Sequence, residues 1–294
     1  MKPIVTLYER EHTPIDTLPV ELATVYGGGF TLPQYEWQRR PYMLANFVET
    51  IDGVVSYNAP GQTGGAAVSG DNKQDQMVMG LLRAYADAVI IGTSSLRADA
   101  NHLHIPSTIS PAYAEAYAEL RKRLGKQAEL PLTVIVTASG AVNMEDKTFH
   151  AAGLRVVLAT TKKGADALSQ KTLPEGVDVR VIEQDDKAEV SVSPANVLGL
   201  LAHEYNVRVA LYEGGPHLLS SFLKAQLIDE LFVTVAPHLA GHAEDTQRFS
   251  LMEGATFQPE QGWAALLSVK LAESHLLLRY KFMSQRKERG SGRL

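Results

Sequence analysis

Ten short apolar runs, rich in β-branched residues, alternate with polar segments along the chain and predict ten β-strands. They cover residues 4–8, 43–48, 88–91, 132–137, 154–159, 177–182, 207–212, 231–235, 263–271 and 275–282. Helical periodicity separates several of these runs. A helix is predicted over residues 71–86, with one apolar face made of Met77, Val78, Leu81, Leu82 and Tyr85.

Two further helices are predicted, over residues 111–124 and from Pro194 to about His203, the second with Ser193 as its N-cap. Strands and helices alternate from residue 87 to residue 213, which favours a largely parallel sheet covered by helices on both faces. The last three strands follow one another without a helix, so we expect them to add antiparallel edges. With no repeat and no linker, one α/β domain is expected.

Three segments predict turns or loops. Residues 58–70 and 93–111 are long and polar, and loops of that length are usually functional or disordered. Asp52-Gly53 lies between apolar runs and predicts a hairpin turn. The polar residues 286–294 predict a frayed tail.

Composition narrows the class of protein. The 294 residues carry a net charge of −5, which does not suggest a nucleic-acid binder. The absence of cysteine excludes disulfides, cysteine-ligated zinc, iron–sulfur clusters and thiol catalysis. No segment resembles a signal peptide or a membrane span, so we expect a soluble, cytoplasmic protein.

The segment 207–223, VRVALYEGGPHLLSSFL, changes from a strand to an amphipathic helix that begins at about Pro216. Free amides at a helix start bind anions, and Gly214 and Gly215 would let a phosphate approach the backbone. His217 and Leu218 follow in the first turn. Glu213 lies at the strand's carboxyl end, where open α/β sheets bind ligands. A simple tight turn with a solvated acid is the alternative.

A second strand end carries the hydroxyl-rich run Gly92-Thr93-Ser94-Ser95. These hydroxyls could hold phosphate or ribose, with Arg97 on a phosphate and Asp99 on a sugar hydroxyl; a helix cap and a surface salt bridge are the alternative. Arg83 could bind an anionic substrate in a bidentate manner or only cover a surface. Lys162-Lys163 could hold a cofactor 2′-phosphate or simply be solvated.

Asp52 is either a turn residue or a substrate contact and proton relay. Common phosphate, dinucleotide and zinc-protease motifs are absent, and neither His102/His104 nor His238/His242 has convincing metal-ligand spacing, so no metal is expected.

The stretches NFVETIDGVVS, LLRAYADAVIIGTSSLRADA and LYEGGPHLLSSFLKAQLIDELFVTVAPHLAG occur in this order. Together they resemble the pyrimidine reductases of riboflavin biosynthesis, the reductase half of the bifunctional deaminase–reductase. The resemblance implies a dihydrofolate-reductase-like, three-layer α/β/α fold, with a reductase domain over 41–285 behind an N-terminal extension, 1–40. It also implies a homodimer that uses NADPH to reduce a ribosylamino-pyrimidine phosphate to the ribitylamino form, with hydride transfer to the sugar C1.

By matching position, Ser95 and Asp99 are implied cofactor contacts, the turn from Gly215 to Ser221 the pyrophosphate site, and Arg83 and Glu213 substrate contacts. Asp52 or Glu213 is the expected proton relay.

Three departures affect the substrate half. Asn46 stands where many relatives carry a lysine, Ala67-Val68-Ser69 replaces Trp-Ile-Thr, and His102 and His104 occupy a loop that usually ends in a phosphate-binding arginine. A changed or dephosphorylated substrate therefore stays open, as do reduction of another heterocycle such as a pterin and a non-catalytic nucleotide-binding module. A cysteine-free chain cannot hold the zinc of the deaminase half.

Overall fold

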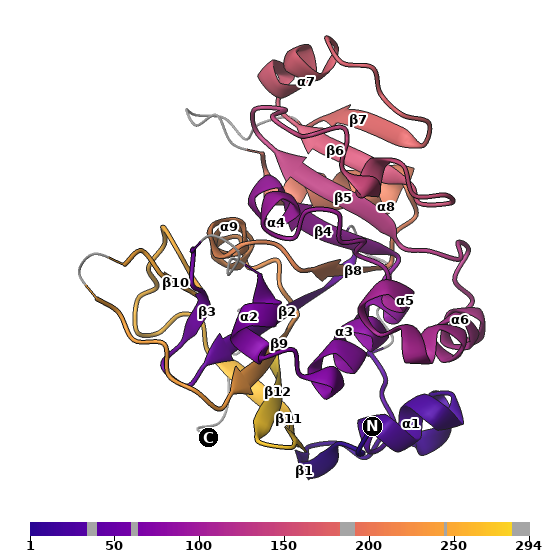
Figure 1. Ribbon diagram of the computed structural model, residues 1–294, viewed down its shortest axis with the longest axis vertical. Coiled ribbons are helices and arrows are strands. Elements are labelled where there is room, and N and C mark those ends of the chain that lie inside the picture. Colours follow the sequence, from indigo (N-terminus) through magenta and orange to yellow (C-terminus); the bar gives the residue numbers. More distant parts are fainter. Residues whose placement is uncertain (34–39, 60–63, 183–191, 244–245, 284–294) are drawn as a thin grey trace, which may run out of the picture.

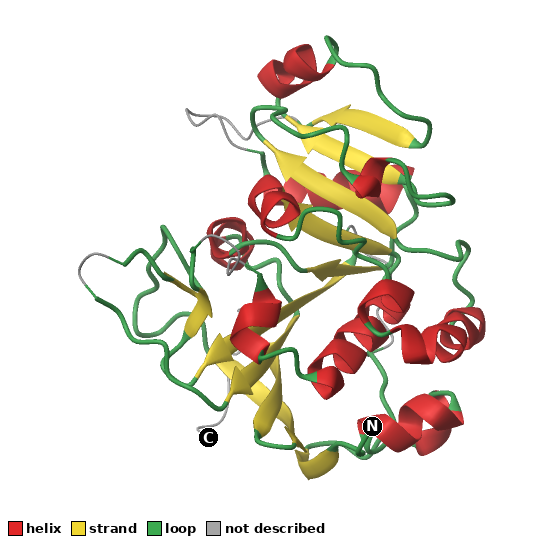
Figure 2. Cartoon of the chain, viewed as in Figure 1, coloured by secondary structure: helices red, strands yellow, loops and turns green. Residues whose placement is uncertain are grey.

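The computed structural model describes residues 1–33, 40–59, 64–182, 192–243 and 246–283. Ten strands form one twisted sheet in the order β1-β11-β12-β9-β2-β8-β4-β5-β6-β7 (Figure 1). Helices cover both of its faces, which gives the three-layer α/β/α architecture that the sequence predicts (Figure 2). No helix in the described ranges is both long and apolar enough to cross a membrane.

All ten predicted strands are confirmed. Their bounds are β1 Val5–Glu9, β2 Tyr42–Thr50, β4 Ala88–Gly92, β5 Leu132–Thr137, β6 Val156–Thr160, β7 Val177–Val181, β8 Val209–Tyr212, β9 Glu230–Ala236, β11 Ala264–Ala272 and β12 His275–Phe282. The neighbours from β9 to β7 pair in parallel, and β12, β11 and β1 add antiparallel pairs. The last three strands were expected to be antiparallel. This holds for β11 and β12, whereas β9 is antiparallel to β12 but parallel to β2.

Period-two alternation divides the sheet residues between two cores. On one face, Leu44, Ile91 and Leu211 pack with residues of α1 (Val20–Tyr26), α3 (Lys73–Tyr85), α6 (Ala114–Arg123) and α7 (Lys162–Leu168). On the other face, Met43, Ile90 and Tyr212 pack against α8 (Pro194–Glu204) and α9 (Pro216–Lys224). Successive residues of one strand therefore serve opposite layers.

The predicted helices lie where the periodicity puts them. Helix α3 starts after Asn72, whose side chain accepts a hydrogen bond from the Asp75 amide, and its predicted apolar face is buried. Helix α8 starts at Pro194 with Ser193 as its N-cap, as predicted. A short 3₁₀ helix, η2 (Pro111–Tyr113), directly precedes α6. Another, η3 (Lys147–Phe149), lies between β5 and β6 in the chain.

Both stretches that were predicted to be long loops contain short helices, so the prediction of loops is wrong there. Residues 93–111 contain α4 (Thr93–Ala98) and α5 (Pro106–Ile109), because Leu96 and Ile105 pack into the core and hold short helical turns against the sheet. The described part of 58–70 contains α2 (Gly65–Ser69), anchored by the buried Val68. Residues 60–63 of that stretch lie outside the described residues.

Asp52-Gly53 forms a turn, as predicted, but the strands on its two sides do not pair with each other as a hairpin. Gly53 has a φ of 82° and donates its amide to the Thr50 carbonyl, which closes the turn. The strand that follows, β3 (Val54–Ser56), pairs instead with β10 (Phe249–Ser250) in a separate two-stranded sheet. The prediction failed because β10 is far along the chain and too short to be recognised.

The N-terminal segment is built into the molecule. Strand β1 pairs with β11, and the 3₁₀ helix η1 (Ile15–Thr17) leads into α1. Ile4, Leu22 and Phe30 are fully buried in the core. The tail predicted over 286–294 lies outside the described residues.

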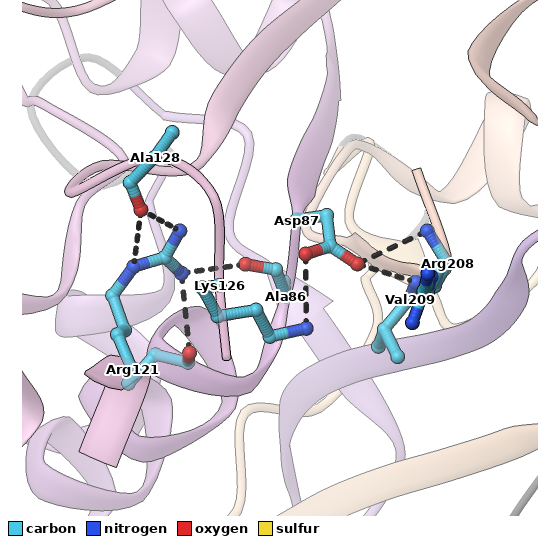
Figure 3. Close-up of polar contacts among 8 residues, drawn as sticks. Ala86, Asp87, Arg121, Lys126, Ala128, Arg208 and Val209 are labelled. Carbon is cyan, nitrogen blue, oxygen red and sulfur yellow. Dashed lines mark hydrogen bonds and ion pairs between the residues drawn. The ribbon is translucent and has the colours of Figure 1, made fainter. Parts of the chain in front are cut away.

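At the amino ends of β4 and β8, one buried and two half-buried charged side chains connect loops to strands (Figure 3). Asp87 accepts hydrogen bonds from the Arg208 and Val209 amides and pairs with Lys126 Nζ at 3.0 Å. Arg121 donates to the carbonyls of Ala84, Ala86 and Ala128. These side chains are engaged in contacts within the protein. The candidate ligand site is therefore sought at the carboxyl ends of β4 and β8.

Candidate active site

A cavity opens where the sheet splits at the carboxyl end of β8. Beyond Tyr212, β2 pairs only with β9, and Gly92 of β4 pairs only with β5. The connection after β8 leads to β9, which lies on the β2 side of β8. The connection after β4 leads to β5, which lies on the opposite side. Ligands of open α/β sheets bind at such a switch point.

The cavity has a volume of about 950 Å³, a size typical of small-molecule and cofactor sites. The lining residues come from β2, β3, β10, α2, α3, α4, α5, the start of α9 and the loops beside them. They are Asn46, Phe47, Val48, Val55, Ser56, Asn58, Gly64, Gly65, Ala66, Asp75, Met79, Arg83, Ser94, Ser95, Arg97, Ala98, Asp99, Ala100, His102, His104, Ile109, Glu213, Gly214, Gly215, Pro216, His217 and Phe249.

The β8–α9 turn explains its two glycines and its proline. A Cβ on Gly214 would lie 2.5 Å from the Tyr212 hydroxyl and 2.7 Å from the ring, so the aromatic ring itself requires glycine there. Gly215 is the N-cap of α9, its carbonyl accepts the Tyr212 hydroxyl at 2.7 Å, and Pro216 is the first helical residue. The first intrahelical bond comes from Leu219, so the preceding amides of α9 are available to an anion.

The β4–α4 turn lies against the β8–α9 turn. A Cβ on Gly215 would be 3.2 Å from Ser94 Oγ and 3.8 Å from Ser95 Oγ, and one on Gly92 would be 3.7 Å from the Leu218 side chain. Two helix starts and two serine hydroxyls therefore converge at the same edge of the cavity. This arrangement offers several neutral donors to a polyanionic group such as a diphosphate.

On the α3 side of the sheet, a buried ion pair lines the cavity. Arg83 Nε donates to Glu213 Oε2 at 2.8 Å, and the two side chains are 3% and 6% exposed. Glu213 Oε1 accepts no hydrogen bond of normal length from any described residue. Burial raises the pKa of Glu213, while Arg83 and Asn46 lower it, and the net direction is upward.

Two histidines extend this network. Arg83 Nη1 lies 3.2 Å from His102 Nε2, and because a guanidinium can only donate, His102 must accept at Nε2 and carry its proton on Nδ1. Burial and the charge of Arg83 lower the pKa of His102 to about 4. The same two causes hold the pKa of His104 well below its usual range, and its buried Nδ1 has no hydrogen-bond partner.

Two aspartates complete the polar lining. Asp99 ends α4 and packs against the backbone of Gly64, where a Cβ would collide with Asp99 Oδ1, and burial raises the pKa of Asp99. Asp75 accepts the Thr234 hydroxyl at 2.6 Å across the interface between α3 and β9. Burial raises the pKa of Asp75 to about 6, against the lowering effects of Thr234 and His275.

Most of the predicted site residues line the cavity together. They are Asn46, Arg83, Ser95, Asp99, Glu213, Gly214, Gly215, Pro216 and His217, and Arg97 joins them. Gly92, Thr93 and Leu218 belong to the two turns but are not among the lining residues. Lys162 and Lys163 are exposed at the start of α7 and do not line the cavity either.

Asp52 is apart from the cavity, and its carboxylate has a structural role. It accepts the Thr50 hydroxyl and the amides of Ala240 and Gly241, at 3.0 and 2.6 Å for the two amides. These hydrogen bonds, that of Thr50 first, hold the pKa of Asp52 well below its usual range. An anchored, ionised turn residue does not suit a proton relay, so the catalytic prediction for Asp52 is not supported by its position.

Asp75 is the functional candidate that sequence reasoning missed. It lies three residues before Val78 and seven before Leu82, on the buried face of α3, and an acid at such a position is a recognisable sign of a special role. Phe47 and Phe249 also line the cavity. They come from β2 and β10, about 200 residues apart, so the sequence alone could not bring them together. In the described part of the chain, no group of three or more His, Asp or Glu side chains has metal-binding proximity.

Known proteins share most of this chain's sequence length. The model of the RibD C-terminal domain matches residues 41–274. The chain is 24% identical over 207 residues to the riboflavin biosynthesis protein RibD of Aquifex aeolicus, covering 70% of this chain and 49% of that protein, so it spans about half of that relative's length. It is 26% identical over 209 residues to the 2,5-diamino-6-ribosylamino-4(3H)-pyrimidinone 5′-phosphate reductase of Archaeoglobus fulgidus, covering 69% of this chain and 83% of that protein.

Solved structures share the fold. A pyrimidine reductase-like protein from Corynebacterium diphtheriae has a TM-score of 0.62 at 19% identity, over 83% of this chain and 92% of that one. RibD from Acinetobacter baumannii has a TM-score of 0.58 at 22% identity, over 83% of this chain and 58% of that one. Since the family model covers most of the sequence, the chain belongs to the RibD C-terminal domain family.

Proposed function

We propose that this chain is a reductase of riboflavin biosynthesis that uses NADPH to reduce a ribosylamino-pyrimidine to its ribitylamino form. Family membership and the reductase activity in the name of the Archaeoglobus fulgidus relative support the reductase activity. The observation that carries the proposal is the meeting of the β4–α4 and β8–α9 turns at one cavity, which also contains a buried Arg83–Glu213 pair.

The lining residues suit a dinucleotide phosphate. The amides that open α9 and the hydroxyls of Ser94 and Ser95 would hold the diphosphate, and Arg97 adds a cation on the same side. When bound, such a cofactor supplies the hydride, so the protein has to bind and orient the reactants, exclude water and transfer at most a proton. That division of labour fits a cavity without a nucleophile–base pair or a metal cluster among its described residues.

Glu213 is the residue to which we assign proton transfer. Glu213 lines the cavity, its Oε1 is buried and accepts no hydrogen bond of normal length from any described residue, and its pKa is raised. A carboxyl group whose pKa is raised is better suited to general acid catalysis than one with an ordinary pKa. Arg83 would keep Oε2 fixed and so orient the acid.

The test is NADPH oxidation, followed by absorbance, with ribosylamino-pyrimidines as substrates. Turnover by the wild type, and a loss of about 10²–10⁴-fold in kcat for Glu213→Gln, is expected if Glu213 is the acid. NADPH binding, followed by fluorescence, should survive in that variant. If neither binding nor oxidation of NADPH occurs, the proposal is wrong. The homodimer stays a prediction, which light scattering can check.

A further inference from the structure

Asp75 is a buried acid that the roles assigned so far leave without a function. It is 6% exposed and lies on α3, about two turns before Arg83, and both residues line the cavity. An aspartate is almost never fully buried unless it is paired. Among the residues that the structure describes, one hydrogen bond reaches its carboxyl group, from the Thr234 hydroxyl at 2.6 Å. An ionised carboxylate has room for about four, so it can accept further donors from a ligand.

Thr234 lies on the face of the sheet that α3 covers. Phe232, two residues earlier on β9, packs in the core beneath α3, so the Thr234 side chain points the same way. On the neighbouring strand β2, Leu44 packs in that core as well, and Asn46 follows it by two residues. Asn46 and Thr234 therefore belong to one face of the sheet, on adjacent strands.

Glu213 extends this face to a third strand, β8. Its bond with Arg83 of α3 places its carboxyl group on the α3 side. Tyr212, the last residue of β8, pairs with Ala45 of β2. Glu213 therefore lies next to Asn46, whose side chain interacts with it. The cavity thus has two carboxyl groups on one side of the sheet, with the Asn46 amide on the strand between them.

The surroundings of Asp75 disfavour its charge. Burial, above all, raises the pKa of Asp75 to about 6, and the Thr234 hydrogen bond and the charge of His275 work against that rise. The charge of Glu213 adds to it. The group is still mainly ionised at neutral pH, as an incompletely compensated carboxylate. A charge that burial penalises and that lines a cavity indicates a role in function rather than in stability.

Reduction of a ribosylamino-pyrimidine produces a group that would compensate this charge. When the sugar ring oxygen is protonated, the bond from C1 to that oxygen breaks and its electron pair goes to the oxygen. The lone pair of the amino nitrogen then forms a C1=N⁺ iminium group, which keeps its N–H. C1 receives the hydride, and the electrons of the double bond return to nitrogen, which gives the neutral amine. A fixed carboxylate beside this nitrogen would stabilise the positive charge that develops on it.

We propose that Asp75 is a second catalytic residue of this reductase, whose carboxylate accepts the N–H of the substrate's ribosylamino nitrogen and stabilises the cation formed there. Thr234 is then a positioning residue, because its hydroxyl holds one carboxylate oxygen and leaves the other for the substrate. This inference rests on the proposed reductase function, in which Glu213 supplies the proton. It holds whether or not the sugar carries a 5′-phosphate.

The first test is the pH profile of kcat/KM for NADPH oxidation by the full chain. The substrate is 2,5-diamino-6-ribosylamino-4(3H)-pyrimidinone 5′-phosphate or the corresponding aminouracil, whichever the wild type turns over faster. For the wild type, kcat/KM should fall as the pH drops below about 6, because Asp75 becomes protonated. Asp75→Asn should lose about 10²-fold at neutral pH, as when one group that stabilises a developing charge is removed, and should lack this acid limb.

Two further measurements separate a catalytic from a structural role. NADPH binding by Asp75→Asn, followed by fluorescence, should stay within about twofold of the wild type, because Asp75 belongs to neither of the turns that would hold the diphosphate. In urea unfolding at neutral pH, the variant should be at least as stable as the wild type, because it no longer buries a charge. A purely structural residue would lose stability and activity together.

A matched pair of variants at Thr234 tests the positioning role. Thr234→Val keeps the shape of the side chain but removes the donor, so the pKa of Asp75 rises and the acid limb should move to higher pH. Thr234→Ser keeps the hydroxyl and should keep the limb in place. Circular dichroism checks that both variants are folded.

The outcomes separate this inference from the proposed function. An unchanged kcat/KM in Asp75→Asn, or an acid limb that persists in that variant, overturns the inference and leaves the reductase function intact. Loss of the alkaline limb in place of the acid limb overturns it as well, since Asp75 would then be the proton donor. A wild type that neither binds nor oxidises NADPH overturns both.

Discussion

Replacing Arg83 by methionine removes one partner of the buried ion pair and keeps most of the side-chain volume. The pair is joined at 2.8 Å with side chains only 3% and 6% exposed, so Glu213 would be left uncompensated in the interior. Breaking a buried pair from one side typically costs about 3–5 kcal/mol. His102 and the Ile105 carbonyl would also lose a donor, which places Arg83→Met toward the upper part of that range.

The loss should depend on pH. Without Arg83, the pKa of Glu213 rises further above its unfolded value, since the guanidinium that lowers it is gone. A carboxyl whose folded pKa is raised binds a proton on folding, and its variant is therefore less destabilised at low pH than at high pH. Urea unfolding followed by circular dichroism at pH 5.5 and at pH 8, values chosen as roughly below and above neutrality, should show a larger deficit at pH 8.

The double variant Arg83→Met/Glu213→Leu is the matched control. With both charges removed, the loss should be smaller than that of Arg83→Met alone, because no unpaired charge remains. A deficit below about 1 kcal/mol for Arg83→Met, as for a surface pair, would refute the buried-pair reasoning. So would a deficit that is equal at the two pH values.

Three further changes test other parts of the structure. Asp75→Asn removes a carboxyl whose pKa is raised to about 6 by burial, so the wild type should lose stability relative to the variant as pH rises from about 4 to about 6, by on the order of 2–3 kcal/mol in urea unfolding; a flat difference contradicts this. Gly214→Ala pushes a Cβ into the Tyr212 ring, and its melting temperature should fall by several degrees, roughly as for about 1–3 kcal/mol of overpacking, whereas an unchanged value would show that the ring moves freely. Asp52→Asn should keep kcat within about twofold because the residue is outside the cavity lining, and a large loss of kcat would restore it as a catalytic candidate.

The sequence predicts those parts of the fold that local pattern determines. All ten strands of the main sheet and the helices around Leu81 and Leu198 follow from periodicity, and Pro216 marks the start of α9 correctly. Strand ends at Gly92 and Tyr212 also point to one edge, because parallel strands align their carboxyl ends. The convergence of the two turns was therefore predictable.

The structural features that the sequence pattern does not predict depend on contacts between residues far apart in the chain. The two-residue strand β10 exists only because β3 pairs with it, and α4 and α5 form because Leu96 and Ile105 find a core. The sequence leaves Asp52 open between a turn residue and a proton relay, and the amides that anchor it come from residues nearly 190 positions away. Asp75 lies at a position on the buried face of α3 that periodicity could have revealed, but its partner Thr234 lies on another element and could not be identified from the sequence.

A crystal structure with bound NADP⁺ tests the central claim most directly. The account predicts that the diphosphate contacts the amides at the start of α9, together with Ser94 and Ser95, and that the nicotinamide ring enters the cavity beside Glu213. A dinucleotide bound at another edge of the sheet, or a nicotinamide ring remote from Glu213, would contradict it.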